Sequence, residues 1–180
     1  MSRRASRARR RPRHARPHEG GDPRLAATLG LDVGERRIGV ALGDPTGTLA
    51  TPLTTIGRTS DRAAIEAIAD LARQHGAGVL VVGLPLGIDG TLSRQAARVA
   101  AFGRKLRAIP QVRVVFWTER YSTATAGEAL AAARPARRAP LRSPRRREAA
   151  RRRLDAAAAA VILQDYLEHQ RAPCPQRGAD

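Results

Sequence analysis

The sequence has few of the features on which secreted and membrane-spanning proteins depend. Its single cysteine, Cys174, cannot form a disulfide within the chain, which favours a reducing compartment. No apolar run approaches the roughly 20 residues of a membrane-spanning helix, and no hydrophobic segment follows the arginine-rich start to make a secretory signal. We therefore expect a cytoplasmic protein with no membrane partner.

Aromatic residues are also scarce, at 3%, and lysine occurs once, so arginine supplies nearly all of the formal charge of +17. The charge is concentrated: residues 1–24 carry a net +7 and residues 134–153 a net +9, which leaves +1 for the rest. Arginine-rich segments attract phosphates whatever the base sequence, so nucleic acid is the expected partner. The alternative is a solvated tail and loop in an organism whose codon usage favours arginine.

The length of 180 residues and the 42% hydrophobic content predict one domain with a sizeable core. We expect a disordered arginine-rich tail over 1–25, a folded domain over 26–170 and a C-terminal tail over 171–180. Within the domain, residues 134–147 are expected to form a mobile basic loop.

Hydrophobic periodicity predicts the order β-β-β-α-β-α-β-α-α. This order indicates an α/β fold with a mixed five-stranded sheet and helices on both faces. The ribonuclease H-like fold has it, and so does half of an actin or sugar-kinase ATPase. The expected strands are 26–32, 37–44, 49–56, 78–85 and 112–119, and the expected helices are about 61–75 (Ser60 as N-cap, Gly76 as stop), 91–108, 122–134 and 148–170.

Three carboxylates favour the ribonuclease H-like fold over the ATPase fold. Asp32 ends the first strand, Glu119 ends the last strand, and Asp155 shares a helix face with apolar residues that should pack on the sheet. Acids gathered at one sheet edge repel each other unless a cation offsets their charge. Oxygen ligands suit Mg²⁺ or Mn²⁺, and paired metals of this kind support phosphodiester cleavage.

Each acid also has a structural alternative. Asp32 could bond the turn amides of the sequence DVGE, Glu119 could pair with Arg120, and Asp155 could pair with Arg151 or Arg152. Their joint placement beside a basic loop favours the metal site.

Four ordered blocks resemble the YqgF/RuvX family of pre-16S rRNA nucleases, which are related to Holliday-junction resolvases of the RuvC type. The resemblance runs from about residue 27 to residue 168. The blocks are LGLDVGERRIGVALGD (29–44), VVGLPLGIDGT (81–91), WTERYSTATA (117–126) and LDAAAAAVILQDYL (154–167).

The resemblance implies that Asp32, Glu119 and Asp155 are the catalytic, metal-binding acids of a hydrolase that trims the 5′ end of the 16S rRNA precursor. It implies a ribonuclease H-like fold and a divalent-metal cofactor. The chain departs from the family where Thr118 replaces the usual aspartate before Glu119, and where the loop before the last helix is far more basic.

Polar and basic residues near these acids are the expected phosphate contacts, although the serine and threonine could instead cap a helix. Trp117 is expected to pack rather than to stack on a base. The nucleic-acid-binding candidates are Arg120, Ser122, Thr123, Arg145, Arg146 and Arg147.

Three other functions remain open. A junction resolvase acting on branched DNA would share the carboxylate site. An ATPase of the actin type needs a second, duplicated domain, for which 180 residues leave no room. A non-catalytic assembly factor would bind RNA or ribosomal particles through its arginines. We expect a monomer or a weak homodimer.

Overall fold

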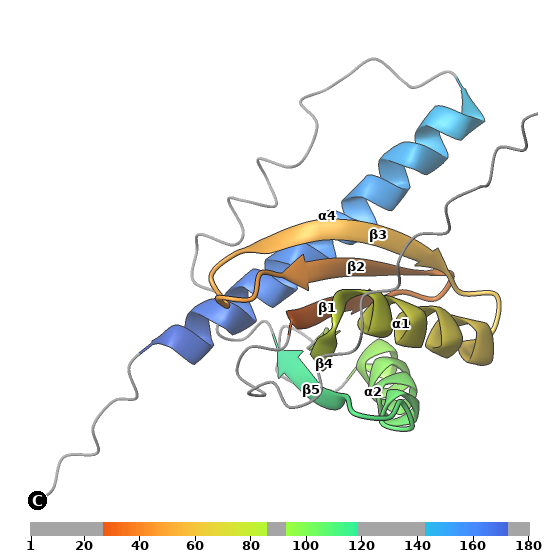
Figure 1. The fold of residues 1–180 in the computed structure, drawn as a ribbon. Coiled ribbons are helices and arrows are strands. Elements are labelled where there is room, and N and C mark those ends of the chain that lie inside the picture. The colour runs from red at the N-terminus through yellow and green to blue at the C-terminus, as the bar shows by residue number, and fades with distance from the viewer. Residues whose placement is uncertain (1–26, 86–92, 119–142, 173–180) are drawn as a thin grey trace, which may run out of the picture.

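The computed structural model describes residues 27–85, 93–118 and 143–172. Within them, five strands form one sheet and helices cover its two faces (Figure 1). In chain order the elements are β1 (Ala27–Val33), β2 (Arg37–Gly43), β3 (Ala50–Gly57), α1 (Asp61–His75), β4 (Ala77–Leu84), α2 (Arg94–Leu106), β5 (Arg113–Thr118) and α4 (Pro144–Arg171).

The sheet has the order β3-β2-β1-β4-β5. The first three strands form an antiparallel meander, whereas β1, β4 and β5 are parallel neighbours. The predicted mixed five-stranded sheet is therefore confirmed. Because the three parallel strands run in one direction, their carboxyl ends meet at one edge, which carries Asp32 near the end of β1.

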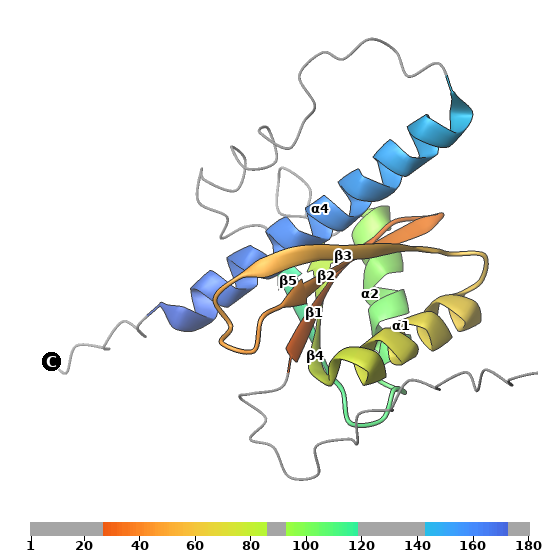
Figure 2. The ribbon, with the colours of Figure 1, turned by 45° about the horizontal axis from the view of Figure 1, so that its top comes forward.

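Alternate residues of each strand face opposite layers. In β1, Leu29, Leu31 and Val33 are buried in a core cluster with α1 and α2 residues. The other face of the sheet packs on α4, through Ala41 of β2 and Val81 of β4 among others. Figures 1 and 2 show α1 and α2 on one side of the sheet and α4 on the other, which confirms helices on both faces.

Helix α1 begins and ends as its sequence predicts. The Ser60 hydroxyl accepts a hydrogen bond from the Ala63 amide at 3.2 Å, and Gly76 ends the helix with a φ of 62°. The core-facing residues Ala64, Ile68 and Ala72 are buried. In α2, the apolar residues Val99, Phe102 and Leu106 are also buried.

The boundary expected before the last helix is wrong. Residues 144–147 were assigned to the loop over 134–147, but α4 already begins at Pro144 and runs to Arg171. Proline lacks an amide hydrogen, so it suits the first helical position, where no intrahelical hydrogen bond is required. Residues 134–142 and the helix expected over 122–134 lie outside the described residues.

Helix α4 approaches the sheet closely because glycines line its path. A Cβ atom added to Gly39 would lie 1.9 Å from the Asp155 carbonyl oxygen, and one added to Gly30 would lie 2.6 Å from Leu163 Cβ. A Cβ on Gly83 would meet Ile162 Cδ1 at 2.6 Å. Of the glycines in the first block, Gly30 and Gly39 therefore make room for the backbone of α4.

Candidate functional site

Asp32 lies on the α4 face of the sheet. Its neighbours Leu31 and Val33 are buried in the α1–α2 layer, so Asp32 faces the other way and is half-buried. It pairs directly with Gly39 of β2, and opposite residues of an antiparallel pair share a face. Asp32 thus stands beside the strand position that α4 crosses.

Asp155 lies on α4 where the helix crosses that position. The near contact between Gly39 and the Asp155 carbonyl places the backbone of residue 155 directly over Gly39. The neighbouring Ala156 and Ala159 are buried, and Asp155 is half-buried on the sheet side, as its helical face predicts. The structure therefore places Asp32 and Asp155 beside the same strand position, Gly39, although they are 123 positions apart in the sequence.

The third predicted acid, Glu119, directly follows the last residue of β5 and lies outside the described residues. Arg120, Ser122 and Thr123 lie outside them too. Within the part of the chain that the structure describes, no group of three or more His, Cys, Asp or Glu residues could hold a metal ion. The proposed three-acid site stays a prediction, because one of its members is not among the residues that could be searched.

The carboxylate oxygens that the structure does place fit a divalent cation in their chemistry. Asp32 and Asp155 offer hard oxygen ligands of the kind that Mg²⁺ and Mn²⁺ prefer. Both side chains are half-buried, so their negative charges are less well screened than on an open surface.

A basic residue that the sequence analysis missed contacts this site. Arg37, the first residue of β2, donates a hydrogen bond from Nε to Asp155 Oδ2 at 2.6 Å. Its Nη1 donates to Glu148 Oε2 at 3.4 Å. The expected partners of Asp155 were Arg151 or Arg152, but Arg152 donates instead to Glu148 at 3.3 Å.

The sequence did carry a signal for this contact. Arg37 and Gly39 are two positions apart in one strand and so share a face. A glycine on an otherwise apolar strand indicates the close approach of another backbone. Only the register between α4 and β2 shows that this backbone belongs to residue 155.

Arg58 supports the turn that follows Asp32. Its Nη1 donates to the Gly34 carbonyl at 3.0 Å, and its guanidinium lies 4.5 Å from the centre of the Phe102 ring. Arg58 also donates to Asp61. Hydrogen bonds from Lys105 and then from Arg58 lower the pKa of the Asp61 carboxyl. The α1–α2 layer thus supports the β1–β2 turn from the side opposite α4.

The described arginine candidates lie on the first turns of α4, which project beyond the sheet (Figure 1). Arg145, Arg146 and Arg147 are all exposed there. Further along, an open groove runs between α4 and the edge strand β3, where the Thr55 hydroxyl donates to the Arg152 carbonyl at 2.7 Å. The groove is lined by Pro52, Leu53, Thr54, Thr55, Arg152, Arg153 and Ala156.

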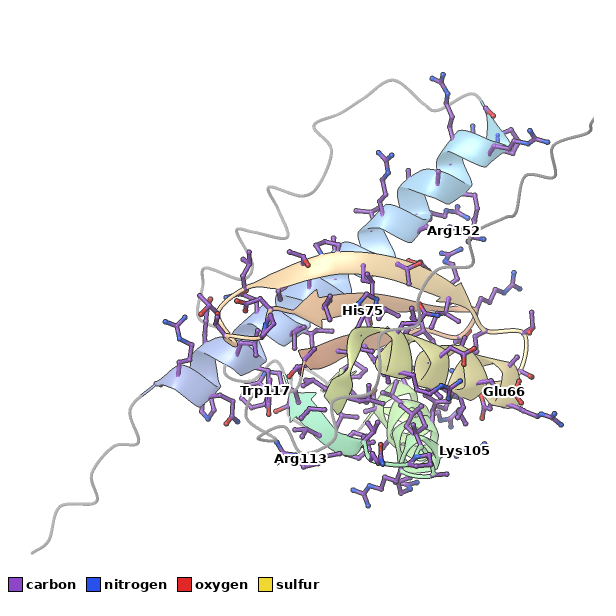
Figure 3. All side chains as sticks on the ribbon, viewed as in Figure 1. Glu66, His75, Lys105, Arg113, Trp117 and Arg152 are labelled. Atoms are coloured by element: carbon purple, nitrogen blue, oxygen red, sulfur yellow. The ribbon has the colours of Figure 1, made fainter. Side chains whose placement is uncertain are left out.

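Trp117 packs as predicted. Its ring meets Tyr166 of α4 edge-on at 5.4 Å between centroids, and its Nε1 donates to Asp165 Oδ2 at 2.6 Å. Figure 3 labels Trp117 at the end of β5 and Arg152 on α4. Trp117 thus fixes α4 against the last strand.

Among the described helices, none is long and apolar enough to cross a membrane.

Comparison with known proteins identifies relatives over most of the chain. A family model described as RuvX, Holliday junction resolvase, matches residues 26–169. A Moorella thermoacetica protein named "Putative pre-16S rRNA nuclease" is 44% identical over 140 residues, which are 78% of this chain and 93% of that protein. A Roseiflexus protein of the same name is 41% identical over 143 residues, 79% of this chain and 94% of its own.

A solved structure shares the fold. The structure described as "T. thermophilus RuvC in complex with Holliday junction substrate" matches with a TM-score of 0.50 and 13% identity, covering 82% of this chain and 98% of that chain. The predicted ribonuclease H-like fold is therefore confirmed. Together with the sequence matches, this shows that the chain belongs to the RuvX (YqgF) family of Holliday junction resolvase-like proteins.

Proposed function

We propose that this chain is a divalent-metal-dependent nuclease that hydrolyses RNA phosphodiester bonds and processes the 5′ end of the 16S rRNA precursor in the cytoplasm. The observation that carries the proposal is the placement of Asp32 and of residue 155 beside the same strand position, Gly39. The names of the relatives from Moorella thermoacetica and Roseiflexus support the choice of substrate.

Asp32, Asp155 and Glu119 would hold Mg²⁺ or Mn²⁺. Glu119 follows β5 directly in the sequence, and it is proposed as the third acid on the strength of the family resemblance. A bound divalent cation supplies Lewis-acid polarisation of a phosphoryl oxygen. The chain itself supplies two fixed carboxylates: strand pairing holds Asp32, and the glycine contact and Arg37 hold Asp155.

The RNA backbone would lie along the basic surface beside these acids. Arg145, Arg146 and Arg147 are exposed at one end of α4, and Arg152 and Arg153 line the groove next to β3. Arginine forks bind phosphate oxygens through paired hydrogen bonds. Arg120, Ser122 and Thr123 are proposed as further phosphate contacts close to the acids.

The test is to replace Asp32 by Asn and to map the ends that form when precursor rRNA is incubated with Mg²⁺ or Mn²⁺. We expect the variant to fold and to bind RNA, with cleavage slowed at least about 100-fold, because losing even an outer partner of a metal site costs 10–100-fold. Asp70→Asn is the matched control, since Asp70 is an exposed aspartate of α1. Undiminished cleavage by Asp32→Asn would reject the assignment.

A junction resolvase is the second candidate, because the matching family model is described as a Holliday junction resolvase. The solved structure that shares the fold also holds a Holliday junction. Cleavage of a four-way DNA junction beside the precursor rRNA separates the two substrates. Salt-sensitive RNA binding without turnover of either substrate would instead favour a non-catalytic assembly factor that acts on ribosomal particles.

A further inference from the structure

Arg37 reaches from the sheet to two acids of α4. Its Nε donates to Asp155 Oδ2 at 2.6 Å, and its Nη1 donates to Glu148 Oε2 at 3.4 Å. Glu148 and Asp155 are seven residues apart, which places them on one helix face about two turns from each other. The guanidinium therefore spans the helix face that meets the carboxylate site.

The Arg37–Asp155 pair is shielded and rigidly mounted. The two side chains are 29% and 27% exposed, whereas the surface pair of Arg62 and Glu66 is 89% and 62% exposed. The backbone of Arg37 pairs with Gly57 of β3, and the next residue of β2, Ile38, pairs with Val33 of β1. Because strand pairing already fixes the backbone of Arg37, less conformational entropy is lost when its side chain binds Asp155.

The Arg37 contact engages only one of the two oxygens of the Asp155 carboxylate. Within the described residues, the hydrogen bond to Asp155 engages Oδ2, and no bond of Oδ1 is found there. Carboxylates that bind metals are commonly held through one oxygen by an outer hydrogen-bond donor, which fixes the direction of the other oxygen.

We propose that Arg37 is a positioning residue for Asp155: it holds Oδ2 so that Oδ1 is presented to the divalent cation. This inference rests on the proposed function. Arg37 also offsets the repulsion between the acids before a cation is bound. The opposite possibility is that Arg37 competes with the cation for Asp155, and the two predict changes of opposite sign in metal affinity.

The experiment measures the Mn²⁺ dissociation constant of the full chain by titration calorimetry, without nucleic acid. We expect Arg37→Gln to weaken Mn²⁺ binding about 10- to 100-fold, the usual cost of losing an outer partner of a metal ligand. Arg37→Lys keeps the charge but loses the fork, so it should recover part of the affinity.

Two variants control for charge and for the second contact. Arg62→Gln removes an arginine from an exposed pair on α1 and should leave Mn²⁺ binding unchanged. Glu148→Gln removes the longer, more exposed contact of Arg37 and should weaken Mn²⁺ binding much less than Arg37→Gln. Thermal unfolding without metal shows whether each variant is folded; if Arg37→Gln is not, Arg37→Lys carries the test.

Equal or tighter Mn²⁺ binding by a folded Arg37 variant overturns the positioning role and leaves the proposed function intact. No Mn²⁺ binding by the unaltered protein overturns the metal site itself, and this inference with it. The two failures are therefore distinguishable in one titration series.

Discussion

At the scale of single residues, Asp44 shows how a turn carboxylate differs from those of the candidate site. Asp44 follows β2 and accepts hydrogen bonds from the amides of Leu49 and Thr48, at 2.9 and 2.7 Å, and from the Thr46 hydroxyl. These bonds, led by the Leu49 amide, lower the pKa of Asp44 from 3.8 to about 2. Its oxygens are thus occupied by the β2–β3 turn.

The lowered pKa predicts a pH-dependent contribution to stability. A carboxyl whose folded pKa lies below its unfolded value stabilises the fold above about pH 4, and this contribution is lost as the pH falls from 3.8 to about 2. Asp44→Asn should therefore be less stable than the unaltered protein at pH 6, with the difference shrinking towards pH 2. Urea unfolding at several pH values measures it, and a difference that does not change with pH would contradict it.

Arg37 shows what residue chemistry alone leaves open. The acid types at positions 32 and 155 pointed to a metal site, because carboxylates at a sheet edge require a compensating cation. The expected partner of Asp155, Arg151 or Arg152 in the preceding turn of α4, is wrong. The arginine that contacts Asp155 is Arg37 of β2.

At the scale of elements, the crossing of α4 over the sheet forms the site. The helix passes so close to β2 that a Cβ at Gly39 would overlap the Asp155 carbonyl at 1.9 Å. That contact involves the backbone of both elements, so neither side can yield by a change of rotamer. The same crossing brings Asp155 beside Asp32.

We expect Gly39→Ala to destabilise the fold by about 3 kcal/mol, at the upper end of the usual cost of overpacking. Displacement of α4 should also weaken metal binding. Gly57→Ala is the matched control, because a Cβ there meets nothing within 4 Å, and it should change stability by less than about 0.5 kcal/mol. Urea unfolding measures both, and equal stabilities would show that α4 does not depend on Gly39.

Hydrophobic periodicity does not reveal where α4 begins. Pro144 and the three arginines that follow it are exposed and form no apolar stripe, so the hydrophobic pattern places them in a loop. Proline at the first helical position was the available signal. Three of the candidate RNA contacts therefore stand on a helix rather than on a mobile segment.

At the scale of the whole molecule, two arginine-rich segments of the sequence carry nearly all of the net charge, and the described part of the second one begins α4. The net +9 of residues 134–153 includes the exposed arginines of the projecting turns of α4 (Figure 2). Such a surface attracts a polyphosphate chain over long range and weakens with salt.

Replacing Arg145, Arg146 and Arg147 together by Gln should weaken RNA binding uniformly across sequences. If each contacts one phosphate, the slope of log affinity against log salt should fall by about 2, at roughly 0.7 per contact with single-stranded RNA. The control replaces Arg62, Arg73 and Arg104, three exposed arginines of α1 and α2. An equal loss in both triple variants would mean that only the total charge counts.

The sequence by itself indicated the mixed sheet, the family and the described elements, apart from the start of α4. Periodicity and capping are local signals, so about 10 to 15 neighbouring residues suffice to specify a helix or a strand. It also indicated Asp32 and Asp155 as candidates, because an acid on an apolar face is costly unless it is compensated.

The tertiary structure alone decided which groups meet. The register of α4 against β2 places residue 155 over Gly39 and selects Arg37 as the partner of Asp155. That register depends on close contacts between segments more than 100 residues apart, such as Arg37 and Asp155, at |i−j| = 118. A local pattern, such as a glycine in an apolar strand, can indicate that another backbone comes close, but it does not identify the partner, because the partner depends on how α4 packs against the sheet.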